Sequence, residues 1–275
     1  MRRTFLRTIG SAALGAGLSA VATAGSAFLA ACVGTEEDGD STTGKRVTLA
    51  TQVELRSGTS FTNALGWAFT LTKVQISSGA LYYFDGEPLE SVARAPSPSP
   101  ASSFFLGVAH AHPGHYKEGN AKGEMLEAAS YDLVEGPATL GTGEGVSGVF
   151  RSARFTYQSP AAGALASQMG SAVAIVEGSA TKDGVTKTFR LVALLEDVLD
   201  AEGEPVLEGC VFDEVDVEAD GTVVVKIDPA VWLDQAELGG LPDGAAPAEV
   251  PRGDVVHLAF ARGLKKSTAC HFSFA

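Results

Sequence analysis

Apolar and polar residues alternate along most of the chain after residue 45, which is the pattern of strands buried on one face. Turn dipeptides separate several of these runs, namely Asp85-Gly86, Asp183-Gly184 and Asp220-Gly221. The alternating runs cover residues 45–56, 67–76, 79–84, 147–157, 171–181, 185–196, 208–218, 222–227, 255–262 and 269–274. Almost no stretch has a long helical period. The pattern therefore predicts an all-β fold, an antiparallel β-sandwich or Greek-key barrel with a few short helices and long loops.

Several segments between these runs are read differently. Asp228 followed by Pro229 is typical of the first turn of a short helix, with the aspartate as its cap. Residues 87–102 are rich in proline and serine and predict a loop. Residues 117–140 fit a short helix from residue 123 or a strand at 131–134. The glycine-rich residues 141–148 predict a flexible loop, because no Lys-Ser/Thr pair follows to make a phosphate cradle.

The first 31 residues have the features of an export signal. Three arginines (Arg2, Arg3 and Arg7) precede an uncharged run of small and apolar residues. The run ends in Leu29-Ala-Ala-Cys32, which resembles the lipobox of bacterial lipoproteins, and the paired arginines resemble a twin-arginine signal, which carries folded cargo. A membrane-spanning helix is the alternative. The resemblance implies a lipidated Cys32 and, with Val33 after it, anchoring in the outer membrane of a Gram-negative cell envelope.

Composition then divides the rest of the chain. Residues 32–44 are acidic and lack apolar spacing, so we expect a lipidated flexible tether followed by a single domain at 45–275. The formal charge of −13 becomes −16 once the signal's three arginines are removed. This acidity argues against nucleic acid as a partner.

With Cys32 assigned to lipid, Cys210 and Cys270 are left to form a disulfide in an oxidising compartment, a thiolate metal site being the alternative.

Candidate metal ligands gather at one place in the sequence. His110, His112 and His115 lie within six residues at the end of the apolar run that begins at Ser103. If that run is a strand, the first two imidazoles share a face, and Pro113-Gly114 can turn the chain to bring the third toward them. Neutral imidazole suits copper and zinc. The alternative is a solvated loop whose histidines bind nothing.

Two further residues could complete such a site. Glu118 follows the cluster closely, and His257 shares an apolar face with Val255 and Ala259 if residues 255–262 form a strand. His257 could equally be a histidine satisfied within the core. A three-histidine zinc with a bound water would allow hydrolysis. However, no general base or Ser/His/Asp set can be assembled from spacing, so the sequence favours a protein that is not an enzyme.

Three stretches carry a resemblance to a known family, namely residues 61–71, 79–84 and 222–232. In order and character they resemble the periplasmic copper-binding β-sandwich proteins associated with methanobactin uptake. That family's copper site combines imidazoles with an oxidised tryptophan, and neither Trp67 nor Trp232 aligns with that position. The resemblance implies copper before zinc, and binding or delivery before catalysis.

The sequence thus predicts a lipid-anchored envelope protein that captures, senses or delivers copper or zinc. We expect it to contact the membrane through its lipid and to work with a metal-handling partner. Two other functions stay open: a metal-free module for adhesion or for binding protein or glycan, and a zinc-dependent hydrolase.

Overall fold

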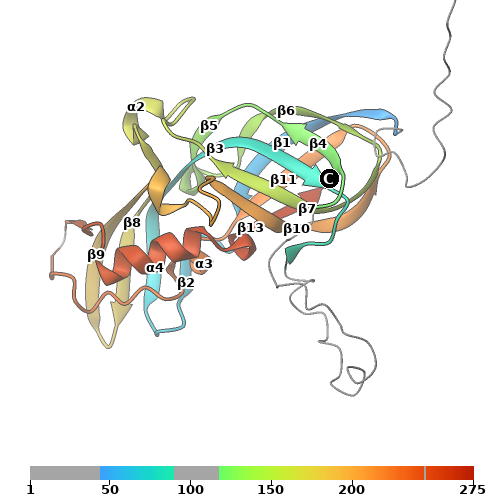
Figure 1. The fold of residues 1–275 in the computed structure, drawn as a ribbon. Helices are drawn as coiled ribbons and strands as arrows, with labels where there is room; N and C mark the ends of the chain where they lie inside the picture. Colours follow the sequence, from blue (N-terminus) through green and yellow to red (C-terminus); the bar gives the residue numbers. More distant parts are fainter. Residues whose placement is uncertain (1–43, 90–117, 245) are drawn as a thin grey trace, which may run out of the picture. The chain divides into compact units, whose positions relative to one another are not determined.

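The computed structural model describes residues 44–89, 118–244 and 246–275, which lie within one compact unit. In these ranges the chain forms thirteen strands of a single mixed sheet and three short α-helices (Figure 1). The all-β prediction is confirmed. The purely antiparallel arrangement is wrong, because three neighbouring pairs are parallel: β1 (Arg46–Leu55) with β11 (Gly221–Ile227), β10 (Val206–Val217) with β13 (Cys270–Phe274), and β9 (Val185–Leu194) with β12 (Ala248–Glu249).

Eight of the strands close on themselves, so that each has a paired neighbour on both sides. Their order is β3 (Ala68–Phe84), β4 (Ala121–Met125), β6 (Ala138–Val146), β1, β11, β13, β10 and β7 (Gly148–Tyr157), and β7 pairs with β3 again. We call this ring the barrel. Of the two predicted architectures, this part of the chain therefore matches the barrel, in which closure leaves no free strand edge.

Aromatic side chains fill the inside of the barrel. The Phe212 ring lies 5.9 Å from Tyr83, 5.5 Å from Phe150 and 6.1 Å from Phe272, measured between centroids. The Tyr83 hydroxyl shares a 3.2 Å hydrogen bond with Thr51, so its polar end is satisfied although the residue is buried. Burial raises the pKa of Tyr83 well above its usual value. The barrel interior is thus a packed core.

Beyond the barrel, β3 continues into an open sheet. Its first nine residues, 68–76, pair with β8 (Ala172–Lys182), while its last residues pair with β4 and β7. We define the sheet extension as this part of β3 together with β8, β9, β12 and the short β2 (Ser60–Thr62). A further strand, β5 (Ala129–Asp132), pairs with β3 at residues 75–78, between the two regions.

Two helices, α3 (Pro229–Leu233) and α4 (Val255–Leu264), cover the sheet extension (Figure 1). Their buried contact is an edge-to-face pair of Trp232 and Phe260, with ring centroids 6.2 Å apart. A Cβ at Gly263 would lie 2.3 Å from the Trp232 carbonyl oxygen, so only glycine allows this approach. The remaining α-helix, α2 (Ala166–Met169), lies beside β8.

The predicted strand at 255–262 is wrong, because these residues form α4. The Asp254 carboxylate accepts a 2.8 Å hydrogen bond from the Val256 amide and caps the helix. Buried residues then recur at Val256, Phe260 and Leu264, the spacing of one helix face. The predicted helix after Asp228 is confirmed as α3, with the Asp228 carboxylate as its cap.

The glycine-rich residues 141–148 are also not a loop, since β6 spans 138–146. Their glycines allow close packing of strands: an added Cβ would lie 2.1 Å from the Glu124 carbonyl oxygen at Gly143, and 2.9 Å from a Leu49 methyl at Gly145. From residue 118 on, the ambiguous stretch contains β4, β5, a single 3-10 turn at Leu133–Glu135 and the start of β6, and residues 123–130 do not form the helix considered from the sequence. Glycine therefore marks narrow strand pairing here.

Candidate functional site

The chain leaves and re-enters the described structure at one edge of the barrel. Where β3 ends and β4 begins, the Gly86 amide donates to the Glu118 carbonyl (3.0 Å) and the Asp85 amide donates to the Asn120 carbonyl (3.2 Å). The Asp85 carboxylate also accepts a 2.7 Å bond from the Asn120 amide. These bonds hold Gly86 next to Glu118, so the described segments before and after this interval meet at the same edge of the barrel.

Glu118 is part of a charged cluster at this edge. The Arg154 guanidinium on β7 contacts the Glu118 carboxylate and also donates a 3.0 Å hydrogen bond to Glu208 on β10. It lies 5.9 Å from the centre of the Phe84 ring. Two carboxylates thus share one guanidinium, and one face of that guanidinium packs against the apolar Phe84 ring. This arrangement strengthens the charge-assisted hydrogen bonds.

The environment of Glu208 favours its protonated form. Burial raises the pKa of Glu208, the hydrogen bond with Glu118 and the negative charge of Glu118 raise it further, and only Arg154 lowers it. One arginine does not fully neutralise two acids. The cluster therefore keeps an excess of negative charge, which can attract a cation or hold a proton.

The three histidines of the sequence cluster, His110, His112 and His115, lie outside the described residues, as do Cys32, the predicted signal and the tether up to residue 43. Of the predicted ligands, the structure places Glu118 and His257. Glu118 contacts Arg154 on β7 and interacts with Glu208 on β10, whereas His257 lies on α4 against β9. The described residues thus do not bring these two predicted ligands together.

His257 has the surroundings of a core histidine. It is 2% exposed, and its Nε2 lies 3.2 Å from the Val192 carbonyl oxygen and 3.6 Å from the Asp197 carboxylate. Its Nδ1 is buried with no hydrogen-bond partner. The Asp197 carboxylate is itself bound by Arg252 and by the Leu194 amide. These contacts match the interpretation of His257 as part of the core.

The remaining predicted pair, Cys210 and Cys270, lies in the barrel wall as two buried free cysteines. Within residues 44–89, 118–244 and 246–275 there is no group of three or more His, Cys, Asp or Glu side chains arranged to hold a metal ion. In the same ranges no helix is long and apolar enough to cross a bilayer.

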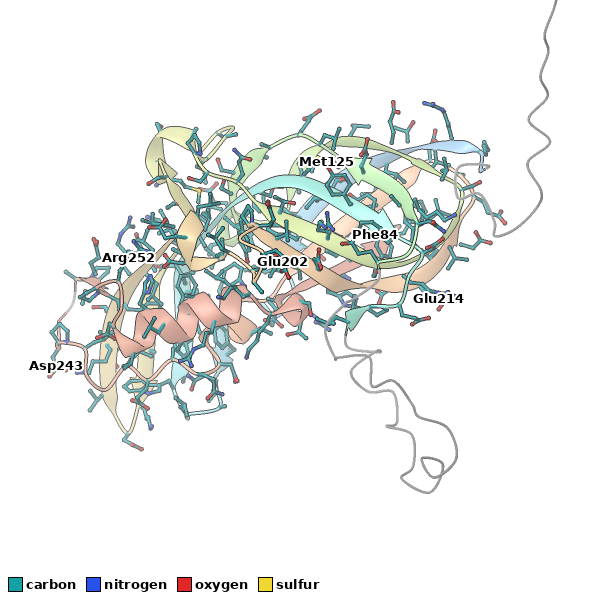
Figure 2. The ribbon with its side chains drawn as sticks, in the orientation of Figure 1. Phe84, Met125, Glu202, Glu214, Asp243 and Arg252 are labelled. Atoms are coloured by element: carbon teal, nitrogen blue, oxygen red, sulfur yellow. The ribbon has the colours of Figure 1, made fainter. Side chains whose placement is uncertain are left out.

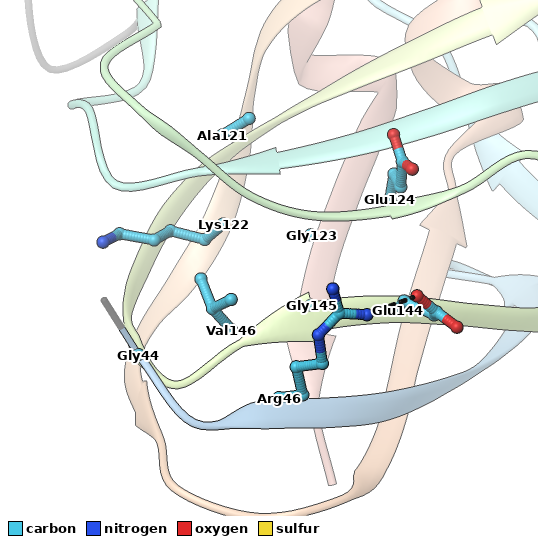
Figure 3. A pocket seen from close by; sticks show the side chains of 9 residues that line it. All are labelled: Gly44, Arg46, Ala121, Lys122, Gly123, Glu124, Glu144, Gly145 and Val146. Atoms are coloured by element: carbon cyan, nitrogen blue, oxygen red, sulfur yellow. Dashed lines mark ion pairs between the residues drawn. The ribbon is translucent and has the colours of Figure 1, made fainter. Parts of the chain in front are cut away.

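A surface hollow of about 380 Å³ lies at the other side of β4, between β4, β6 and the start of β1 (Figure 3). Arg46 pairs with Glu144 at 3.6 Å, and both side chains are more than four-fifths exposed. Lys122 and Glu124 point to different sides of the hollow (Figure 3). Apart from the Arg46–Glu144 pair, the charged side chains at the hollow point away from one another.

Sequence reasoning did not find Arg154 and Glu208. Both residues alternate with buried apolar ones on strands that carry other charged side chains, which is the ordinary pattern of a solvated face. Their meeting depends on the register of β10 against β7, which pairs Leu207 with Phe155. That register cannot be read from local sequence.

Comparisons of the chain with protein-family models, with characterised proteins and with solved structures found no match. The resemblance to the methanobactin-associated copper proteins therefore rests on the sequence stretches named above.

Proposed function

We propose that this protein is an exported, lipid-anchored protein of the cell envelope that binds copper or zinc through His110, His112 and His115. The observation that carries the proposal is the presence of three histidines within six residues, around the turn-favouring pair Pro113-Gly114. Three neutral imidazoles provide most of a transition-metal coordination sphere and leave a position open for a further ligand.

The described edge of the barrel supports this proposal in two ways. Glu118 comes three residues after His115, and among the described residues its carboxylate pairs with Arg154, which it shares with Glu208. Glu87 and Glu214 add acidic charge at the same edge, around Arg151, at 3.9 and 3.3 Å. An acidic surface raises the local concentration of cations. Glu118 is thus suited to act as a further ligand or to stabilise the charge of a bound ion.

The resemblance to periplasmic copper-binding proteins favours copper over zinc, and capture or delivery over catalysis. The charged cluster also favours binding, because Arg154 holds both carboxylates in ion pairs and leaves no free general base among them. Hydrolysis at a bound zinc therefore ranks below binding, as does a metal-free module for adhesion.

The test is metal titration of residues 33–275, which lack the signal and Cys32. Calorimetry with Cu²⁺ and Zn²⁺ would compare this chain with the variant His110→Ala/His112→Ala/His115→Ala. We expect tight binding of one ion, and a loss of affinity of at least about 100-fold in the variant, since even outer partners of a site contribute ~10–100-fold.

Two controls sharpen the result. His271→Ala removes an imidazole that is bound to Asp213 at 2.8 Å on the outside of β13, so it should leave affinity unchanged. Glu118→Gln should weaken binding by about 10-fold if the carboxylate takes part. Equal affinity of the triple variant and the unaltered chain would refute the metal proposal and leave a metal-free module.

A further inference from the structure

Two buried cysteines face each other in the wall of the barrel. Cys210 lies on β10 and Cys270 begins β13, and these neighbouring strands run parallel with Phe212 opposite Phe272. Two positions earlier in the same register, Cys210 stands opposite Cys270. Side chains two residues apart share a face of a strand. Both cysteines therefore point into the barrel, where they are 0% and 1% exposed.

The contacts agree with this register. The rings of Phe212 and Phe272 stack at 6.1 Å with planes 17° apart, so facing side chains on these strands touch. The Cys210 thiol donates to the Leu207 carbonyl oxygen at 3.5 Å, and Cys210 is close enough to Cys270 to raise the pKa of the Cys270 thiol. Neighbouring strands lie about 4.8 Å apart, and disulfides span Cα distances of about 4.4–6.8 Å. A bridge therefore needs no change of strand pairing.

We propose that Cys210 and Cys270 form a disulfide that joins β13 to β10, and that it forms before the barrel closes. The reaction is exchange with an external disulfide, such as oxidised glutathione or a protein disulfide. One cysteine attacks that disulfide, forms a mixed disulfide and releases one thiol; the other cysteine then displaces the second thiol. The two electrons and two protons of the cysteines leave in the two released thiols.

The timing follows from the burial of both sulfurs. An external disulfide cannot reach either sulfur in the closed barrel, and exchange requires a thiolate. Burial raises the pKa of the Cys270 thiol well above its usual value, and the neighbouring Cys210 raises it further. The folded protein should therefore keep the two cysteines as they were when the barrel closed, either as free thiols or as a disulfide. A chain that folds in an oxidising compartment would close with the bridge in place.

The bridge would stabilise the end of the chain. The segment from Cys210 to Cys270 contains β11, α3 and α4, and within the described residues β13 pairs with β11 and β10. Closing a loop of about 60 residues restricts the unfolded chain, and for a domain of this size that should raise Tm by about 10 °C.

The test uses residues 33–275, unfolded and reduced in guanidinium chloride. One portion is refolded in a mixture of reduced and oxidised glutathione, and a second with a phosphine reductant. Thiols are then counted in denaturant, and digested protein is examined by mass spectrometry. We expect no free thiol and a linked Cys210–Cys270 peptide in the first portion, two free thiols in the second, and a Tm difference of about 10 °C.

A third portion tests the timing. Reduced protein that has already refolded is given oxidised glutathione without denaturant, and it should keep both thiols for hours. The variant Cys210→Ala/Cys270→Ala is the control, and its Tm should be the same in both refolding buffers. Two free thiols after refolding with glutathione would overturn the bridge, and rapid oxidation of the folded protein would overturn the timing. No readout involves metal, so the outcome is independent of the proposed function.

Discussion

The barrel and the sheet extension solve the same problem, the exposed edge of a sheet, in different ways. In the barrel every strand has two paired neighbours, so backbone pairing alone removes the edge. In the extension, the described residues of β12 cover the outer side of β9 over a short length, with two paired positions. Figure 2 shows Asp243 and Arg252 beside the extension, while Phe84 and Met125 mark the barrel. The extension therefore depends on side chains and helices to finish it.

Those side chains cover the edge of β9 one after another. The Lys187 ammonium donates to the Leu241 carbonyl at 2.6 Å and to Asp243 at 2.5 Å, and the Thr188 hydroxyl donates to the carbonyls of Gly244 and Ala246. Farther along the strand, His257 lies against the Val192 carbonyl. Each of these side-chain bonds can break separately, whereas in the closed barrel every strand is held by continuous backbone pairing on both sides. We therefore expect the extension to open before the barrel.

The largest expected effect comes from removing the helix contact that covers the extension. Trp232→Ala deletes a fully buried ring, and we expect a loss of about 3–5 kcal/mol in the free energy of unfolding, measured by denaturant titration. Native-state hydrogen exchange should then become faster in β8 and β9 than in β1 and β11, because the cover of the extension is lost first.

Phe212→Ala is the matched variant in the barrel. It also removes a buried aromatic ring and should cost a similar free energy. In this variant, hydrogen exchange should become faster in the barrel and in the extension together. The reason is that β3 runs through both regions, so loss of the barrel also removes the strand on which the extension is built. If both variants accelerate exchange evenly in all strands, the two regions form one cooperative unit and the comparison fails.

A smaller effect should follow from uncovering the edge of β9. Lys187→Met keeps most of the buried side-chain length but removes the ammonium, leaving the Leu241 carbonyl without this donor. We expect a loss of about 1–3 kcal/mol. The exposed edge should also favour pairing between molecules, seen as concentration-dependent association in analytical ultracentrifugation. Thr186→Val, on the same strand, is the control and should cause no association.

The sequence predicted the class of fold and most of the strands because alternation is a local signal. It also predicted the hairpin at Asp183-Gly184, whose residues have φ of 52° and 77° and join β8 to β9. It missed α4 because Val255, Val256 and Leu258 suit a strand as well as a helix. The sequence signal that distinguishes a helix here is Asp254, the residue that caps it.

The candidate site was less predictable, for a physical reason. The cluster of Glu118, Arg154 and Glu208 is assembled by the register of β7 against β10 and by the segment that leads into β4, which come from distant parts of the chain. Local sequence contains no information on which strands become neighbours, and the parallel pairing of β10 with β13 is equally non-local. The histidine cluster is local in sequence, and whether it binds metal stays a prediction.

The smallest expected effect compares two glutamates whose environments act in opposite directions. Glu177, in the extension, is partly buried, which raises its pKa, but hydrogen bonds from Lys73 and Arg190 outweigh burial and lower it below the usual 4.5. Glu208, in the barrel, has its pKa raised, first by burial and then by Glu118. Folding thus favours the charged form of Glu177 and the neutral form of Glu208.

Linkage gives the two glutamates opposite pH dependences. The contribution of Glu177 is present above the pKa of the unfolded chain and is lost as pH falls through its lower folded pKa, so Glu177→Gln should cost most near pH 7 and little near pH 3. The contribution of Glu208 is present below about pH 4.5 and is lost as pH rises through its raised folded pKa. Glu208→Gln, a neutral mimic, should therefore gain in Tm relative to the unaltered protein between about pH 4 and pH 7. Thermal unfolding across this range measures both slopes. If the Tm differences caused by Glu177→Gln and Glu208→Gln changed with pH in the same direction, the opposite pKa shifts of the two glutamates would be wrong.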